Sequence, residues 1–311
     1  MELFDAHCDT ISRCLETGEG LLQNGGQLDL LRTERFQPYA QVFAIWGDRE
    51  EWGRAHMWEL FQKEYAIFCG EMTKNRDRIV QCRTGAEIRR ANEQGLTAAL
   101  LSVEGADLLE CSIEKLELAD QCGVRIINPT WNHANVLCGS HCDQPERGLS
   151  AEGFHFVKRA DQLGMLVDVS HLSDPGSWDV LETVDGPVIA SHSNARAVFF
   201  HTRNLTDAQI TAIISKNGVI GLNFFPDFLG HPADVGAIIR HLEHILALGG
   251  EKAVAIGGDW DGISATPDGI RDITGVEKLR EELLRRGYSE QLVKDLFYSN
   301  MMRIVSEQCT T

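Results

Sequence analysis

The chain alternates short apolar runs with longer amphipathic stretches from its first residues to its last. The apolar runs are rich in Val, Ile, Leu and Ala, and several are uninterrupted, which is typical of strands buried on both faces. Eight such strands are predicted, at Glu2–Asp5, Tyr39–Trp46, Thr97–Val103, Val124–Asn128, Met165–Ser170, Pro187–Ser191, Val219–Phe224 and Ala253–Gly257.

The stretches between these strands have the spacing of apolar residues that helices show. Helices are predicted at Glu50–Lys74, Thr84–Asn92, Ser112–Cys122, Ala151–Leu163, Asp174–Thr183, Asp207–Ser215, Pro232–Leu248 and Ser289–Ser306. Thr206 and Ser173 are capping residues ahead of two of them. Strands that alternate with helices in this way predict an α/β fold, a (β/α)8 TIM barrel. A doubly wound open sheet is the alternative, but no GxGxxG follows the first strand, which weakens its dinucleotide-binding version.

The length agrees with one large barrel. The chain has 311 residues, of which 43% are hydrophobic and 24% charged, and barrels of this size form single units. No repeat, low-complexity segment or Pro/Ser-rich linker interrupts it. Residues 1–311 are therefore predicted to be one catalytic barrel domain with a C-terminal helix.

Charge and cysteine content exclude several classes of partner. With 29 Lys and Arg against 46 Asp and Glu, the net charge is −17, which disfavours nucleic acid and anionic membrane surfaces. The nine cysteines follow no disulfide framework, and the start MELFDAHCDT has no signal-peptide pattern. No apolar run approaches the about 18 residues that a membrane helix needs. We expect a cytoplasmic protein with reduced thiols; among soluble assemblies, a homodimer is the commonest.

Residues able to bind metal follow five of the predicted strands. They are His7 and Asp9 after the first strand, Glu104 after the third, His171 after the fifth, His192 after the sixth and Asp259 after the eighth. In a parallel barrel these strand ends gather on one face, where active sites lie. Imidazole and carboxylate ligands without thiolate favour zinc, with manganese or cobalt as substitutes. We predict two zinc ions about 3.5–4 Å apart, with His7 and Asp9 on one, His171 and His192 on the other, and Glu104 bridging them.

Seven motifs in order carry a family resemblance. They are DAHCDT, SVEGAD, MLVDVSHLS, PVIASHSNAR, the RN-L of Arg203–Leu205, GLNFF and AIGGDWDG. Together they resemble the membrane (renal) dipeptidase family of binuclear zinc metallopeptidases, as a soluble microbial-type member. The resemblance implies a (β/α)8 barrel with the five metal ligands proposed above. It further implies that Arg203 binds the C-terminal carboxylate of a dipeptide and that Asp259 handles protons. Substrates of that family often carry a D-residue at the C-terminal position, and some members open β-lactam rings.

The stretch after the fourth strand departs from the family pattern. Mammalian members have a histidine there that helps to hold the oxyanion, whereas this chain has Trp131 in its place. An indole donates one N–H and does not titrate near neutrality. His133, two residues further on, is a candidate substitute. Trp131 and His133 are therefore both candidate substrate-binding residues.

The expected reaction is hydrolysis of small dipeptides, including L-Xaa-D-Xaa, by a hydroxide that bridges the two ions. Glu104 and Asp259 are the expected catalytic residues, with Asp259 passing the proton of the water to the leaving amine. One alternative is an amidohydrolase that acts on a cyclic amide, a lactam or an N-acyl amino acid. An alternative of another class is a non-catalytic barrel that binds peptides or metal.

Three further features have simpler interpretations. His133, Cys138, His141 and Cys142 lack the spacing of a structural zinc site, so we expect residues of a loop at the mouth of the site. His241 and His244 are expected on a solvated helix face. Asp261 is expected to form hydrogen bonds at the rim.

Overall fold

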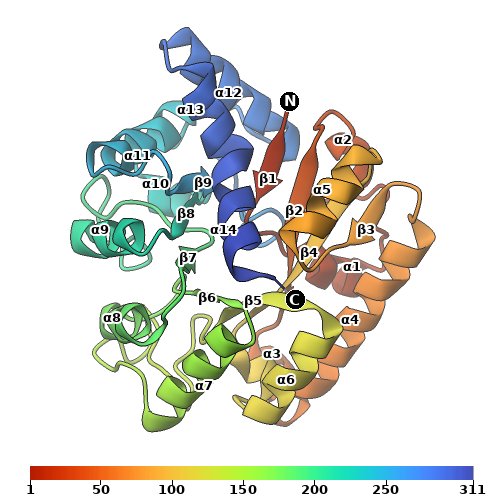
Figure 1. Ribbon diagram of the computed structural model, residues 1–311, viewed down its shortest axis with the longest axis vertical. Helices are drawn as coiled ribbons and strands as arrows, with labels where there is room; N and C mark the ends of the chain where they lie inside the picture. Colours follow the sequence, from red (N-terminus) through yellow and green to blue (C-terminus); the bar gives the residue numbers. More distant parts are fainter. Residues whose placement is uncertain (311) are drawn as a thin grey trace.

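A sheet of nine parallel strands forms the centre of the protein in the computed structural model, which describes residues 1–310 (Figure 1). The strands are β1 (Leu3–Asp5), β2 (Tyr39–Trp46), β3 (Ile79–Gln81), β4 (Thr97–Glu104), β5 (Val124–Asn128), β6 (Leu166–Asp168), β7 (Val188–Ala190), β8 (Val219–Leu222) and β9 (Val254–Ile256). Because β2 pairs with both β1 and β4, all strands except β3 form one closed ring. The predicted (β/α)8 barrel is therefore confirmed.

The strand β3 lies outside this ring and was not predicted. It pairs with the first residues of β4, from Ile79↔Thr97 to Gln81↔Ala99, whereas β5 pairs with the second half of β4. Three residues are too few for a periodic pattern, and Val80 in the middle of β3 is 38% exposed.

Helices surround the barrel, and most begin at a capping side chain. They are α1 (Thr10–Thr17), α2 (Leu30–Thr33), α3 (Arg49–Trp52), α4 (Met57–Lys74), α5 (Gly85–Glu93), α6 (Ile113–Cys122), α7 (Ala151–Gln162), α8 (Asp174–Thr183), α9 (Asp207–Ser215), α10 (Pro226–Leu229), α11 (Val235–Ala247), α12 (Val276–Arg285), α13 (Glu290–Lys294) and α14 (Asn300–Gln308). Thr84 and Thr206 form capping boxes ahead of α5 and α9, and Ser173 accepts from the Gly176 N–H at the start of α8. These side chains satisfy N–H groups that the helix itself leaves free.

Two of the predicted helices differ from the structure, and some helices were not predicted. The predicted helix Glu50–Lys74 is interrupted at Gly53, whose φ of +82° lies in the left-handed region, so α3 and α4 are separate. The predicted helix Ser289–Ser306 contains a π-helical turn at Asp295–Ser299 between α13 and α14. The helices α1, α2, α10 and α12 were not predicted.

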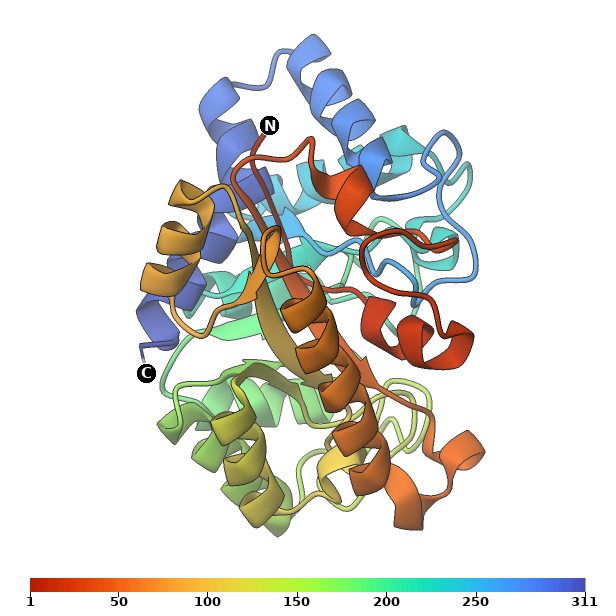
Figure 2. The ribbon, with the colours of Figure 1, turned by 90° about the vertical axis from the view of Figure 1, so that its right-hand side faces the viewer.

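Successive residues of the strands pack in two directions. Phe4 and Leu100 belong to an inner cluster that includes Ile304 of α14, and α14 lies across the middle of the barrel in Figure 1. Phe43 points outward and contacts Phe68 of α4, with 6.2 Å between ring centroids. Figure 2 shows α4 lying lengthwise along the outside of the barrel. The end where the strands begin is thus covered by α14, and the opposite end is left to the loops.

No helix within residues 1–310 is long and apolar enough to cross a membrane.

Candidate active site

The five predicted metal ligands and Asp259 all lie where strands end. His7 and Asp9 follow β1, Glu104 is the last residue of β4, His171 follows β6, His192 follows β7 and Asp259 follows β9. All six are buried, with exposed fractions of at most 9%. Asp9, Glu104, His171 and Asp259 line a cavity of about 250 Å³ at this end of the barrel.

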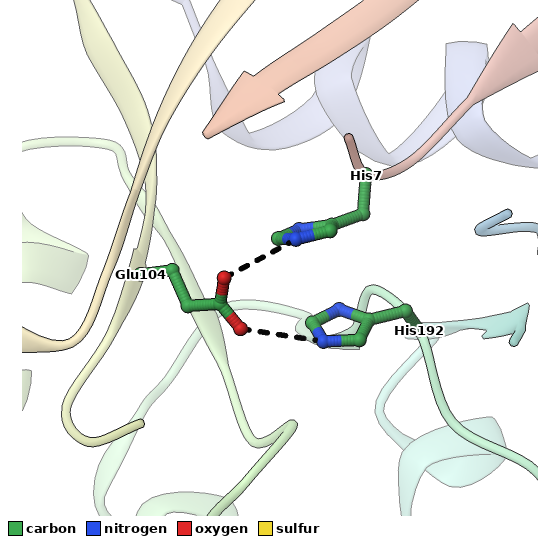
Figure 3. A group of neighbouring side chains, drawn as sticks. All are labelled: His7, Glu104 and His192. Carbon is green, nitrogen blue, oxygen red and sulfur yellow. Dashed lines mark ion pairs between the residues drawn. The ribbon is translucent and has the colours of Figure 1, made fainter. Parts of the chain in front are cut away.

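The carboxylate of Glu104 lies between two groups of donors (Figure 3). Its Oε2 is 3.3 Å from Nε2 of His7, while its Oε1 is 2.8 Å from Nε2 of His171 and 3.4 Å from Nε2 of His192. The Nε2 of His7 is also 3.3 Å from Oδ2 of Asp9. One oxygen of the carboxylate therefore faces His7 and the other faces His171 and His192, an arrangement that is compatible with a bridging ligand.

Two atoms of these side chains that could bind metal lack the hydrogen-bond partner that buried polar atoms normally have. The Nε2 of His7 and the Oδ1 of Asp9 are both buried without a hydrogen-bond partner. Among the described residues, the groups compact enough to hold an ion are His7–Glu104–His192 and His7–Asp9–Asp259. Nitrogen and oxygen donors without thiolate are ligands for zinc and similar divalent ions. The residues present therefore fit a divalent cation.

The electrostatics of the site favour the metal-binding form of some candidate ligands and the protonated form of others. Burial, together with the charge of Arg203, lowers the pKa of His171 to about 4, so its imidazole is neutral near pH 7. Burial raises the pKa of Glu104, but the charge of His7 and the close imidazoles of His171 and His192 hold it well below its ordinary value. Burial lowers the pKa of His7, but Glu104 and Asp9 raise it well above its ordinary value. Metal binding must therefore displace a proton from His7.

Two ligand-bearing loops contain backbone conformations that non-glycine residues rarely adopt. The φ angles are +72° at His171 and +61° at Asp259. Such conformations cost about 1–3 kcal/mol each and persist only where the surroundings enforce them. Here they turn the chain sharply after β6 and β9, at the rim of the cavity.

A second pair of carboxylates holds these turns in place. Asp5 accepts hydrogen bonds from the N–H groups of His7 and Gly258, and from Nε1 of Trp260 at 2.8 Å, which joins the ends of β1 and β9. Asp168 likewise accepts from the N–H groups of Ser170 at 2.9 Å and Ser191 at 3.0 Å.

The roles of Asp5 and Asp168 were not predicted from the sequence. The available signal was a carboxylate inside an otherwise apolar strand, a few residues before a histidine. Buried carboxylates of this kind need donors, and here the donors are the backbone N–H groups of the ligand loops.

Arg203 is a buried cation next to the centre. It is 3% exposed, and its Nη1 donates to Oγ of Ser193 at 2.7 Å. Its Nε and Nη2 have no hydrogen-bond partner, and its guanidinium carbon lies 5.9 Å from the ring centroid of Phe228. Burial lowers its pKa from the ordinary value. A guanidinium with unpaired N–H groups in this environment is suited to an anionic ligand.

The two residues after the fourth predicted strand point in different directions. Trp131 lines the cavity and contacts Trp46, with 4.9 Å between ring centroids. His133 is directed to Asp48, with 3.1 Å from Nε2 to Oδ1, and is not among the lining residues of the cavity. Its predicted substrate contact therefore stays a prediction. His141, expected at the mouth of the site, is the histidine of this loop that lines the cavity.

The remaining predictions have different outcomes. Asp261 forms rim hydrogen bonds as expected, accepting from Oγ1 of Thr10 at 2.7 Å and from the Gln27 N–H at 2.6 Å. The prediction of a solvated face for His241 is wrong, because its ring is buried. Its Nδ1 accepts from the Ala195 N–H at 3.1 Å, three residues beyond His192. The helix α11 thereby supports the loop that carries a candidate ligand.

The chain is similar to known metallo-dipeptidases in sequence and in fold. A sequence model of the family described as membrane dipeptidase (peptidase family M19) matches residues 1–311. A solved structure described as dipeptidase AC, a metallopeptidase of family M19, is 29% identical, with a TM-score of 0.92 over 100% of this chain and 99% of that one. A metallopeptidase from Rhodobacter sphaeroides, solved with a phosphinate mimic of the dipeptide L-Ala-D-Ala, is 28% identical, with a TM-score of 0.90 over 99% of both chains.

A curated relative is less informative about activity. It is an uncharacterized protein in the pqqA 5′ region of Klebsiella pneumoniae, and it is 32% identical over 259 residues. The match covers 79% of this chain and 95% of that protein.

Proposed function

This chain belongs to the membrane dipeptidase family, peptidase family M19, and from that premise we propose that it cleaves small dipeptides with two divalent ions held at the strand ends. It is a metallo-dipeptidase, a hydrolase that acts on peptide bonds. The observation that carries the two-ion proposal is the position of Glu104, whose Oε2 faces His7 and whose Oε1 faces His171 and His192.

The proposed ligand set divides between the two ions. His7 and Asp9 would hold one ion, His171 and His192 would hold the other, and Glu104 would be shared between them. Zinc is the proposed metal, with manganese or cobalt as substitutes. When bound, two such ions make a water nucleophilic at neutral pH. They also polarise the carbonyl of the peptide bond that is cleaved.

Asp259 is the proposed proton carrier. It lines the cavity, and its Oδ2 accepts from Nδ2 of Asn223 at 2.9 Å, which fixes the orientation of the carboxylate. Burial raises its pKa. A carboxylate with a raised pKa can accept a proton from the attacking water and donate it to the leaving amine. Asn223 is a supporting residue that the sequence analysis did not identify.

Arg203 is proposed to bind the C-terminal carboxylate of the substrate. Ser193 holds Nη1, and Nε and Nη2 remain available. A longer peptide has no carboxylate at this position and leaves the buried cation without its partner, which is unfavourable. The anchor therefore favours dipeptides over longer chains.

We propose that L-Xaa-D-Xaa dipeptides are among the substrates. The support is the Rhodobacter sphaeroides metallopeptidase with its mimic of L-Ala-D-Ala, at 28% identity. Trp131 is proposed to contact the substrate as part of the cavity wall. Because an indole cannot supply a proton near neutrality, its contribution is a surface and a single N–H donor.

We also propose one catalytic domain and a cytoplasmic location. The barrel begins with β1 at Leu3 and its end is covered by α14, which reaches Gln308. The nine cysteines are all free, as expected in a reducing compartment.

A dipeptide panel tests the proposed function. The metal-free protein is reconstituted with zinc and assayed with matched L-Xaa-L-Xaa and L-Xaa-D-Xaa dipeptides. Zinc-dependent hydrolysis that a chelator abolishes is expected. Undiminished hydrolysis by a metal-free preparation, or no hydrolysis of any dipeptide by the two-zinc form, contradicts the proposal.

A further inference from the structure

We propose that Asn132 is a positioning residue of the metal centre, whose side-chain oxygen orients the ligand His171 and ties it to His141 in the cavity wall. The proposal rests on the proposed function only for the role of His171 as a ligand. It goes beyond that function by identifying what directs this ligand. Asn132 itself lies in the wall of the same cavity.

Two imidazoles converge on one amide oxygen. The Oδ1 of Asn132 is 2.9 Å from Nδ1 of His171 and 3.0 Å from Nε2 of His141. An amide oxygen only accepts hydrogen bonds, so both ring nitrogens must carry protons. With its proton on Nδ1, His171 directs the lone pair of Nε2 into the site. A histidine that coordinates through Nε2 requires this tautomer.

The role of His171 as a ligand selects the amide orientation of Asn132. If its nitrogen faced the two rings, it would donate to Nδ1 of His171. The ring proton would then lie on Nε2, where it blocks coordination. The oxygen orientation is thus the one that is compatible with a metal ligand.

The orientation of His171 depends on a partner outside its own loop, whereas the orientation of His192 does not. The Nδ1 of His192 lies 2.7 Å from Oγ of Ser191, its neighbour in sequence. The partner of His171 comes instead from a separate loop, and the backbone of His171 has a φ of +72°. Loss of the Asn132 oxygen therefore frees His171 and leaves the Ser191–His192 contact intact.

The loop that carries Asn132 is itself fixed to its surroundings. The backbone oxygen of Asn132 accepts from Oγ of Ser140 at 2.6 Å, and the His141 N–H donates to the backbone oxygen of His171 at 2.9 Å. The Nδ1 of His141 accepts from Oγ1 of Thr202 at 3.0 Å, because its Nε2 already carries the proton. Thr202 directly precedes Arg203. The chain Thr202–His141–Asn132–His171 therefore joins the loops after β7, β5 and β6.

Metal titration without substrate tests the proposal. Zinc and cobalt are added stepwise to metal-free wild type, Asn132→Ala and Asn132→Asp in competition with a chromophoric chelator. In Asn132→Ala, one of the two ions should bind about 10- to 100-fold more weakly, while the other keeps its affinity. In Asn132→Asp, which retains an acceptor oxygen, both affinities should stay within a few-fold of wild type. The control Val136→Ala lies in the same loop, is 57% exposed and should match wild type.

Two results overturn the proposal. One is wild-type affinity for both ions in Asn132→Ala, and the other is an equal loss in the alanine and aspartate variants. If Asn132→Ala does not fold, as judged by circular dichroism, Asn132→Ser and the ¹⁵N shifts of the His171 ring in wild type replace it. If these ¹⁵N shifts show that the His171 ring carries its proton on Nε2 and none on Nδ1, the proposed role of Asn132 is refuted. A wild type that binds two ions but cleaves no dipeptide contradicts the proposed function and leaves this inference intact.

Discussion

Two carboxylates meet in the cavity and differ in what surrounds them. Glu104 faces three imidazoles, which keep it ionised, whereas burial dominates at Asp259 and raises its pKa. Pairs of titratable groups whose environments push their pKa values apart commonly divide the ligand and proton-transfer roles. The structure therefore gives Glu104 the environment of a ligand and Asp259 that of a proton carrier.

The change Asp259→Asn separates these two roles. We expect kcat for a dipeptide to fall about 10²- to 10⁴-fold, because the amide cannot carry the proton. The zinc content should stay close to two per chain, since Glu104 and the histidines are unchanged. Steady-state kinetics and elemental analysis of the same preparation check this. A kcat within threefold of wild type removes Asp259 from the mechanism.

The change Arg203→Ala tests the carboxylate anchor. A hydrogen bond to a charged group contributes about 1.5–3 kcal/mol, so kcat/KM for a dipeptide should fall roughly 10- to 100-fold, mainly through KM. The matched control is the C-terminal amide of the same dipeptide, which lacks the carboxylate. Wild type and variant should cleave that amide at similar rates. An unchanged KM for the free dipeptide favours instead a neutral cyclic amide as substrate.

At the scale of elements, helices were predicted well where a side chain marks their start. The bounds of α8 and α9 agree with the prediction, because Ser173 and Thr206 satisfy the first N–H groups. The strand β3 is too short to show a period, and α12 lies in a stretch for which no helix was proposed. Local signals thus located the elements that carry their own caps or a long apolar run.

The candidate ligands could be predicted because they directly follow strands, and all strand ends of a parallel barrel meet. Asn132 and Asn223 could not, since their partners depend on how loops fold back over the barrel. His241 shows a related limit. Its spacing of three from His244 places the two on neighbouring helix positions but does not say which one faces the barrel.

The buried ring of His241 makes the contact between α11 and the β7 loop sensitive to pH. Burial lowers its pKa to about 4, below the about 6.5 expected in the unfolded chain. The unfolded state therefore binds more protons between pH 4 and 6.5, and stability is complete above this window and falls as pH falls through it. The advantage of wild type over His241→Gln should shrink by roughly 2–3 kcal/mol from pH 7.5 to pH 4.5.

Urea unfolding of both proteins at several pH values measures this difference. Glutamine has no titrating proton, so subtraction isolates His241 from the other histidines. The difference should be flat above pH 7.5. A difference that is also constant down to pH 4.5 means that His241 does not carry this pH dependence.

At the scale of the whole molecule, acidic charge is in excess both on the surface and in the cavity. The net charge is −17, and Asp9, Glu104 and Asp259 are buried close together. Two divalent ions add four positive charges, which offset the cavity carboxylates but leave most of the surface excess. Salt should therefore act mainly on the surface charges and metal on the cavity carboxylates, because salt screens exposed groups far better than buried ones.

Removal of the metal should lower the thermal stability of the whole barrel. The candidate ligands come from the ends of β1, β4, β6 and β7, so an ion that binds the folded state alone stabilises contacts around the ring. A free ion at a hundred times its Kd contributes about 2.7 kcal/mol. For a chain of this size that corresponds to about 4 °C in Tm for each ion.

Calorimetry with and without a chelator measures this shift, and Glu104→Gln is the matched comparison. Without the bridging charge, the variant should hold the ions weakly, and its Tm should change much less on chelation. Added sodium chloride should not restore the Tm of the metal-free wild type, because the repulsion lies between buried carboxylates. If salt restores it fully, the destabilisation belongs to the surface charge instead. An equal shift in both proteins removes Glu104 from the metal centre.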